Sequence, residues 1–469
     1  MRRRLLLPAV LPLALAACVM QPAPEIATPA PDLPPAFFFR PEGSMQAELA
    51  ALLPQSDPAW QMLSQAAIAQ GPSLAEALAR IDTARAGARR AGAERLPNIG
   101  AGADVTRNRI NPAQFGEAGQ QGFIPREQTS YGANITAGWD LDIFGRLKAQ
   151  ERAALARIDA ASAQAQGVRL ALLAEIAASI TDWRTLDARA AAIEADARAA
   201  RQLAGLAKVR EDAGIAPGFD RVRADATASS AATRLAALDS ERARLIGRLV
   251  TLTGQDAASV RAALASPAPA LAAAPAPAAL PSDLLANRPD VAAAAANLAA
   301  ADADLAAAAR ARFPRISLSG VIGLLAFQPE AFFDDSLIGT LSAGIAGPLL
   351  DFGRVGAGID AAAGDKRAAF AAYRGAVFTA LGDAEAAYGT VTAADAEAVL
   401  AVAERDQLDR AAGLAESRYR AGLASFLEVL EARRAADASG ERAAAALGRA
   451  QRARIVLWQA LGGEVAPGT

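Results

Sequence analysis

Asp142-Ile143-Phe144-Gly145-Arg146 returns later in the chain as Leu350-Asp351-Phe352-Gly353-Arg354. The two phenylalanines stand 208 positions apart. Two further pairs of segments keep the same spacing: Ala213–Ala216 with Ala421–Ala424, and Leu252–Gly254 with Ala460–Gly462. Similarity at a fixed spacing indicates an internal repeat, and two copies of one unit usually pack around a pseudo-twofold relation. We therefore expect both copies to contribute equally to the fold.

In each copy, a segment in which apolar residues alternate with small or polar ones precedes the Phe-Gly-Arg motif. Over Tyr131–Leu141, apolar residues alternate with Gly, Asn, Thr and Asp, and shorter alternating runs lie upstream and in the second copy. A period of two indicates a strand with unlike faces, so each copy is predicted to supply one β-hairpin, at 97–142 and 314–351. Strands of about 9 to 11 residues with one apolar face are typical of membrane barrels. A soluble sheet with one face on a core is the alternative.

Four strands are too few to close a barrel, and an open sheet edge is not viable in lipid. The barrel must then be shared among subunits. Two chains would supply eight strands and three would supply twelve, and only the larger barrel leaves an appreciable pore. Trp139 and Tyr131 fit either an interfacial aromatic belt or simple packing.

Long helices are predicted where proline is missing. The chain has 26 prolines, but none lies between Pro125 and Pro217 or between Pro348 and Pro467. Because proline costs about 3 kcal/mol inside a helix, these spans permit unusually long ones. Their narrow apolar stripe and abundant alanine suit close, coiled-coil-like packing. The predicted helices are Arg146–Asp212, Phe219–Thr253, Asp283–Arg312, Gly353–Arg420 and Phe426–Leu461.

Composition excludes much familiar chemistry. The 469 residues include no His and a single Cys. A Ser-His-Asp triad, a Cys-His pair, His-ligated zinc and a disulfide within one chain are therefore excluded. An enzyme that uses only carboxylates, Lys or Tyr is the open alternative. The sequence predicts a protein that is not an enzyme and has neither a metal nor a cofactor.

The N-terminus resembles that of a bacterial lipoprotein. Arg2–Arg4 form a positive region and Leu5–Ala17 an apolar stretch, too short to span a bilayer, so residues 1–17 are predicted to be a signal peptide. The chain's one cysteine, Cys18, follows directly. This arrangement resembles a lipobox, which implies a covalent lipid on Cys18, while Val19 resembles the outer-membrane default. An ordinary signal peptide with a chance cysteine is the alternative.

The mature chain is acidic. Without the three arginines of the signal, 45 basic residues face 50 acidic ones, which argues against nucleic-acid binding. The predicted organisation is a tether at 18–53, a first repeat at 54–265, a linker rich in Pro and Ala at 266–281, a second repeat at 282–462 and a tail at 463–469.

Taken in order, these motifs resemble the TolC-like outer-membrane efflux channels, in their lipoprotein, NodT-type branch. The resemblance rests on the two Phe-Gly-Arg junctions, Leu284–Asp290 and Tyr419–Arg433, and it covers essentially all of the mature chain. It implies an α+β membrane protein: a homotrimer with a 12-stranded barrel in the outer membrane of a Gram-negative bacterium and a long helical coiled-coil tunnel through the periplasm. It also implies an inner-membrane pump and a periplasmic adaptor as partners. An acidic residue common in the family is absent from Val291–Ala296.

Two helix reversals are predicted at 213–217 and 421–425. Gly214 and Gly422 can take the left-handed conformation that such turns need. By resemblance, these tips meet the adaptor, with Ala216 and Ala424 at the contact; two ordinary turns are the alternative. Arg146 and Arg354 are expected to anchor the strand-to-helix bends, beside Phe144, Gly145, Phe352 and Gly353.

A periplasmic gate is the last expectation from the resemblance. Glu428 and Glu431 lie three residues apart on one helical face and match acidic positions at the closed mouth of TolC-like channels. Repeated in a trimer, they would form an acidic ring. Tyr419 would brace the tip, and Asp220 with Arg221 are candidate partners across helices. A solvated helix face is the alternative.

The favoured function is a passive export channel for drugs or other small molecules, energised by a partner pump. The competing interpretation is a lipid-anchored periplasmic coiled-coil scaffold without a pore. The four alternating segments favour the channel, because a scaffold has no use for strands of lipid-spanning length.

Overall fold

The computed structural model describes residues 24–41, 49–111, 126–215, 217–267, 274–334 and 336–463. They form two compact units. The first, the sheet unit, contains Asp82–Asp159 and Ala295–Ala372 with residues up to Pro29; the second, the helical unit, contains Ala30–Ile81, Ala160–Ala294 and Tyr373–Thr469. Four helices, α3, α5, α9 and α10, belong in part to each.

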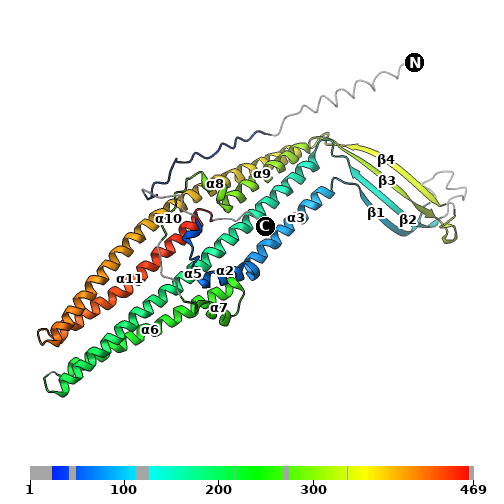
Figure 1. The fold of residues 1–469 in the computed structure, drawn as a ribbon. Helices are drawn as coiled ribbons and strands as arrows, with labels where there is room; N and C mark the ends of the chain where they lie inside the picture. Colours follow the sequence, from blue (N-terminus) through cyan, green and yellow to red (C-terminus); the bar gives the residue numbers. More distant parts are fainter. Residues whose placement is uncertain are drawn as a thin grey trace, which may run out of the picture. The chain divides into compact units, whose positions relative to one another are not determined.

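The elements follow the chain as a strand pair and long helices, given twice (Figure 1). They are η1 (Leu49–Leu52), α2 (Pro58–Gln70), α3 (Pro72–Ala93), β1 (Asn98–Arg109), β2 (Glu127–Asp140), α5 (Arg146–Asp212), α6 (Gly218–Thr253), α7 (Ala257–Leu264), α8 (Asp283–Asn287), α9 (Pro289–Arg310), β3 (Arg315–Ala326), η3 (Pro329–Ala331), β4 (Leu337–Ala346), α10 (Arg354–Arg420) and α11 (Phe426–Ala460).

The sheet unit holds one antiparallel sheet in the order β1-β2-β3-β4. The two hairpins of the repeats join between β2 and β3, where Trp139 pairs with Leu318. Large apolar side chains stay exposed along the strands: Leu341 is 78% exposed, and Ile99, Leu337 and Ile345 are comparable. The apolar sheet surface is suited to contact with lipid. The two open edges, β1 and β4, require further strands to pair with them.

Few contacts tie the sheet to its helices. The Phe144 and Phe313 rings stack with centroids 4.8 Å apart, and Trp139 Nε1 donates to the Arg95 carbonyl over 2.8 Å. Among the described helices, α9 is the one long and apolar enough to cross a membrane by composition. Its apolar character has a packing role, because Leu305 is buried against Ile359 of α10.

The helical unit buries the main apolar core, which includes Leu63, Ile176, Ile180, Leu249, Tyr388 and Leu457. An ion pair crosses this core: Asp57 caps α2 by accepting from Ala59 N, and it also accepts from Arg184 Nε over 2.8 Å. Arg184 in turn donates to the Leu264 carbonyl at the end of α7. The short helix α7, which was not predicted from the sequence, is thereby fixed to the core.

In the helical unit, α5 runs beside α6 and α10 beside α11 (Figure 1). Both α5 and α10 contain 67 residues, which makes each about 100 Å long. Their contact faces are rich in alanine, so the backbones can approach closely. Helices of this length are stable because they pack side by side.

The prediction of one helix over Asp283–Arg312 is wrong. Arg288 is extended, with φ −83° and ψ 120°, and separates α8 from α9. The reason is Pro289, which disfavours the helical conformation in the residue before it and lacks an N–H.

The described end of the predicted linker, 274–281, packs on the helices. Arg454 Nε donates to the Ala274 carbonyl over 2.7 Å, and the Tyr388 hydroxyl donates to the Pro277 carbonyl over 2.8 Å. The segment therefore lies against α10 and α11 of the same unit.

Candidate functional site

The first helix reversal, 213–217, closes α5 with a left-handed glycine. Gly214 has φ +70°, and its N–H donates to the Glu211 carbonyl. Ile215 N–H reaches back to the Arg210 carbonyl over 3.0 Å. A side chain is strained at such a φ, which explains why glycine stands here.

The second reversal, 421–425, repeats this pattern 208 residues later. Gly422 has φ +77°, its N–H donates to the Tyr419 carbonyl, and Leu423 N–H reaches the Arg418 carbonyl over 2.8 Å. Corresponding residues of the two copies thus make the same backbone hydrogen bonds. The two reversals therefore have the same backbone structure.

The two reversals meet in one apolar cluster, which we call the tip cluster: Leu203, Ala204, Ala207, Ala224, Tyr419, Phe426, Val429 and Leu430. The Tyr419 and Phe426 rings are 5.8 Å apart, edge to face. Arg210 covers the Tyr419 ring at 4.7 Å and donates to the Tyr419 carbonyl. Arg210, which was not predicted from the sequence, joins the end of α5 to the end of α10.

Tyr419 is only 3% exposed. Its hydroxyl has no hydrogen-bond partner among the described residues. Burial raises the pKa of Tyr419, the Arg210 guanidinium opposes this effect, and the Asp220 carboxylate adds to it. A tyrosine that is buried and neutral at the tip braces the reversals by packing.

Glu428 caps the start of α11 and also carries an exposed negative charge. Its carboxylate accepts from Ser425 N over 2.7 Å, and the Ser425 hydroxyl accepts from Glu428 N, which completes a capping box at the start of α11. The backbone hydrogen bond from Ser425 lowers the pKa of Glu428, so the side chain is ionised at neutral pH. Glu428 and Glu431 are both exposed, on the side of α11 away from the buried Val429 and Leu430.

Arg221 pairs within its own hairpin. Its guanidinium lies 2.9 Å from Glu211, across the first reversal, and 3.2 Å from Asp225 on α6. Asp220 N–H donates to the Pro217 carbonyl in the same turn. The Arg221–Glu211 pair joins α6 to α5, and the partner Glu211 was not predicted from the sequence.

The strand-to-helix junctions, in the sheet unit, also repeat. Gly145 and Gly353 have φ +75° and +89°. An aspartate caps the following helix in each copy: Asp142 accepts from Leu147 N over 2.8 Å, and Asp351 accepts from Val355 N over 2.8 Å. Asp142 lies two residues before the phenylalanine of its motif, and Asp351 lies one residue before. Because of this one-residue difference, their common role was not predicted from the sequence.

The arginines of the two junctions differ in their surroundings. Arg146 lies 3.1 Å from the Asp140 carboxylate at the end of β2, so it pairs locally. Arg354 and Phe352 are exposed. Phe352 also has φ +51°, an uncommon conformation for a bulky residue.

The Asn-Arg-Pro-Asp motif has a structural role in the helical unit. Arg288 donates to the Ala460 carbonyl at the end of α11 over 3.0 Å. It also pairs with Asp290 at 2.7 Å and with Asp383 of α10 at 3.0 Å. One guanidinium therefore joins the start of α9 to α10 and α11.

The sequence profile of the outer membrane efflux protein family matches residues 63–255 and 280–463. The chain belongs to this family. Outer membrane protein OprJ of Pseudomonas aeruginosa is 30% identical over 410 residues, which cover 83% of this chain and 81% of OprJ. Nodulation protein T of Rhizobium leguminosarum bv. viciae is 27% identical and covers 98% of this chain and 93% of its own.

Solved channels have the same fold. The outer-membrane channel OprN aligns with a TM-score of 0.83 at 25% identity, over 94% of this chain and 99% of OprN. The outer membrane protein VceC from Vibrio cholerae aligns with a TM-score of 0.77 at 25% identity, over 87% and 97%. The predicted fold class is confirmed: each chain of this outer membrane efflux protein contributes four strands to a trimeric barrel and long helices to a tunnel.

The predicted family, function and location are confirmed as well. This outer membrane efflux protein is the passive outer-membrane channel of a tripartite export system in a Gram-negative bacterium. The solved relatives are channels, so the scaffold without a pore is not supported. The family is one of transport proteins. Cys18 and Ala216 lie outside the described residues.

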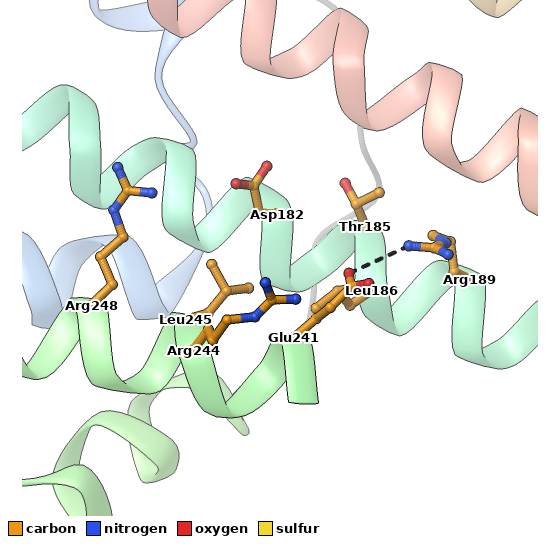
Figure 2. A pocket seen from close by; sticks show the side chains of 8 residues that line it. All are labelled: Asp182, Thr185, Leu186, Arg189, Glu241, Arg244, Leu245 and Arg248. Carbon is orange, nitrogen blue, oxygen red and sulfur yellow. Dashed lines mark ion pairs between the residues drawn. The ribbon is translucent and has the colours of Figure 1, made fainter. Parts of the chain in front are cut away.

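The grooves of the described chain are open and ion-paired. Figure 2 shows one of about 380 Å³, lined by four side chains each from α5 and α6. Three ion pairs lie along it: Arg189 lies 3.6 Å from Glu241, Arg248 pairs with Glu175, and Asp182 pairs with Arg452, whereas Arg244 donates to the Ser240 carbonyl. The groove therefore holds the helices together by ion pairs.

Proposed function

We propose that the two helix reversals of each subunit form the periplasmic mouth of this channel and are its point of contact with the adaptor. The observation that carries the proposal is the duplicated turn geometry at Gly214 and Gly422, brought together in the tip cluster. Exposed apolar side chains extend from both turns: Ile215 is 67% and Leu423 70% exposed. Such side chains fit an apolar partner surface.

The mouth is proposed to be lined by Glu428 and Glu431. Both are exposed, and they face away from the tip cluster. In a trimer each carboxylate occurs three times around the axis, and a narrow acidic ring attracts cations and repels anions. The capping box holds Glu428 in a defined position, which supports a ring of fixed geometry.

The channel is proposed to be lipid-anchored through Cys18, the chain's one cysteine, at the end of the apolar N-terminal stretch. The lipid is covalent, and no metal or other cofactor is proposed. The partners are a periplasmic adaptor and an inner-membrane pump.

The cargo is proposed to be small molecules, by analogy with the relatives. OpmQ of Pseudomonas putida, 29% identical over 391 residues that cover 83% of each chain, is named for pyoverdine export, and MdtQ for multidrug resistance. These names span different chemistries, which agrees with a wide conduit that has no tight substrate pocket.

Two experiments test the proposal. Purified protein in a planar bilayer is expected to conduct, and a silent bilayer would contradict a channel. Cysteines introduced at Ala424 and Leu423 are expected to crosslink to a periplasmic adaptor in cells, whereas a cysteine at exposed Leu400, inside α10, serves as the control. Crosslinking at Leu400 alone would show that the adaptor binds elsewhere.

A further inference from the structure

The antiparallel contact between α5 and α11 has a regular register. Asp182 of α5 pairs with Arg452 of α11, Thr185 lies against Gly448, and Ala192 lies against Gly440. Farther along, Leu203 and Leu430 share the tip cluster. As numbers rise on one helix they fall on the other: the steps are 3, 7 and 11 residues on α5 and 4, 8 and 10 residues on α11. We call this contact the α5–α11 seam.

The seam is tightly packed. A Cβ atom at Gly448 would overlap the Thr185 side chain, and one at Gly440 would lie 3.8 Å from Ala192 Cβ. On α11, Ala436 and Ser439 are 3% and 0% exposed. Small side chains allow the two backbones to approach, so an acid between Ala436 and Ser439 has little access to water.

At one level along the seam, two carboxyl groups, those of Asp196 and Asp437, lie opposite each other. The register places Asp196 of α5 opposite Asp437 of α11, between the Ala192–Gly440 contact and the tip cluster. Asp437 is only 6% exposed, and the Asp196 side chain is 15% exposed. The oxygen Asp196 Oδ2 is buried and finds no donor among the described residues. Two carboxyl groups can hydrogen-bond only when one of them carries a proton.

The surrounding charges do not neutralise the pair. Arg234 of α6 lies 3.8 Å from Asp196 but also pairs with Glu441, one turn beyond Asp437. Glu441 faces Arg189 of α5 at 3.9 Å. Two further charged groups act on Asp437: Arg433 of α11 favours the ionised form, and Asp409 of α10 opposes it.

We propose that Asp196 and Asp437 form a proton-dependent latch between α5 and α11. One proton shared by the two carboxyl groups keeps α5 and α11 in contact at this level of the seam. Loss of that proton leaves two like charges in contact, and their repulsion separates the helices there. The latch joins the hairpin that ends in the first reversal to the hairpin that ends in the second. Any effect on the mouth of the channel rests on the proposed function, whereas the latch itself is a property of the seam.

The direction of the pH effect follows from the burial. Burial and the Asp437 carboxyl raise the pKa of Asp196 to about 8, from an ordinary value of 3.8. Burial also raises the pKa of Asp437. The folded chain therefore keeps a proton that the unfolded chain loses. Its contribution to stability is full below pH 3.8 and is lost as the pH rises toward about 8.

Infrared spectroscopy of the purified full-length trimer tests the shared proton directly. Titration from about pH 5 to about pH 10 should remove a protonated-carboxyl band with a midpoint near 8. In Asp196→Asn and Asp437→Asn, the remaining carboxyl is still buried but has lost its like-charged neighbour, so the midpoint should fall below that of the unmodified protein. Asp182→Asn, which removes another seam carboxylate, should leave the band unchanged.

Hydrogen–deuterium exchange of α11 peptides around Asp437 tests the opening. The ratio of exchange rates between the unmodified protein and Asp437→Asn, taken at each pH, cancels the intrinsic pH dependence of exchange. We expect this ratio to rise several-fold above the midpoint, and the ratio to Asp182→Asn to stay flat.

Two outcomes would overturn the latch. One is the absence of a carboxyl band that titrates near the expected midpoint in the unmodified protein. The other is an exchange ratio that does not vary with pH. If one asparagine variant fails to form trimers, the other supports the same comparison. Neither measurement depends on conductance, so a channel that failed to conduct would count against the proposed function alone.

Discussion

At the residue scale, Glu428 combines a structural and an electrostatic role. Its carboxylate accepts the Ser425 N–H, and its charge faces outward. A change to alanine would remove both roles together. Glutamine keeps the capping hydrogen bond, since the capping box accepts Glu or Gln, and removes only the charge.

The double change Glu428→Gln and Glu431→Gln is therefore expected to lower cation selectivity and weaken block by multivalent cations. The measurement is the reversal potential in a planar bilayer at low salt, where charges are least screened. Glu416→Gln, which removes a half-buried acid paired with Arg420 on α10, is the control. Equal selectivity in the double variant and the unmodified channel would exclude the acidic ring.

Arg288 gives a second prediction at this scale. Its side chain is 10% exposed and bonds to two carboxylates and the Ala460 carbonyl. Arg288→Lys loses the planar, forked geometry, so unfolding should require about 2 kcal/mol less. Thermal unfolding of the trimer measures this, with Arg367→Lys on the exposed face of α10 as the control. If both changes lower the melting temperature equally, the contacts of Arg288 do not make a specific contribution to stability.

At the element scale, the helix reversals depend on backbone conformation. Gly422 combines φ +77° with an N–H that donates to Tyr419. Proline fixes φ near −65° and has no N–H, so Gly422→Pro should distort the turn at a cost above about 1 kcal/mol. Gly214→Pro should act in the same way.

We expect both proline variants to impair export while trimers still form. Drug-susceptibility assays with quantified trimer on native gels measure the two effects separately. Gly413→Ala is the matched control, because Gly413 lies inside α10 with open space at its Cβ position and should tolerate alanine. Normal export by both proline variants would exclude the reversals as the working end of the channel.

At the scale of the whole molecule, anchoring and pore formation are separable. Cys18→Ser should abolish acyl labelling, whereas the barrel should still insert, because its strands carry their own apolar surface. Metabolic labelling with a fatty-acid analogue and planar-bilayer conductance measure the two. Labelling that persists in the variant would refute lipidation at Cys18. A lower cellular abundance of the variant is compatible with the prediction.

Much of the architecture was readable from local pattern. The bounds of α5, Arg146–Asp212, and the left-handed glycines at 214 and 422 agree with the prediction because proline spacing, turn glycines and strand alternation act over a few residues. The break before α9 was missed although Pro289 marks it, because the apolar periodicity continues on both sides. The short helix α7 was missed because its eight residues adjoin a segment rich in Pro and Ala.

The repeat, the order of strands and helices and the resemblance to a channel family could be read from the chain alone, since they depend on periods, motifs and spacings along it. Which side chains meet depends on how the helices pack. Asp196 and Asp437 each look like a solvated acid on an amphipathic helix, and the seam buries them together. Arg288 reaches the last turn of α11, and Arg210 covers Tyr419, for the same reason. Such contacts depend on the register between helices that are far apart in the chain, which packing sets and no local pattern encodes.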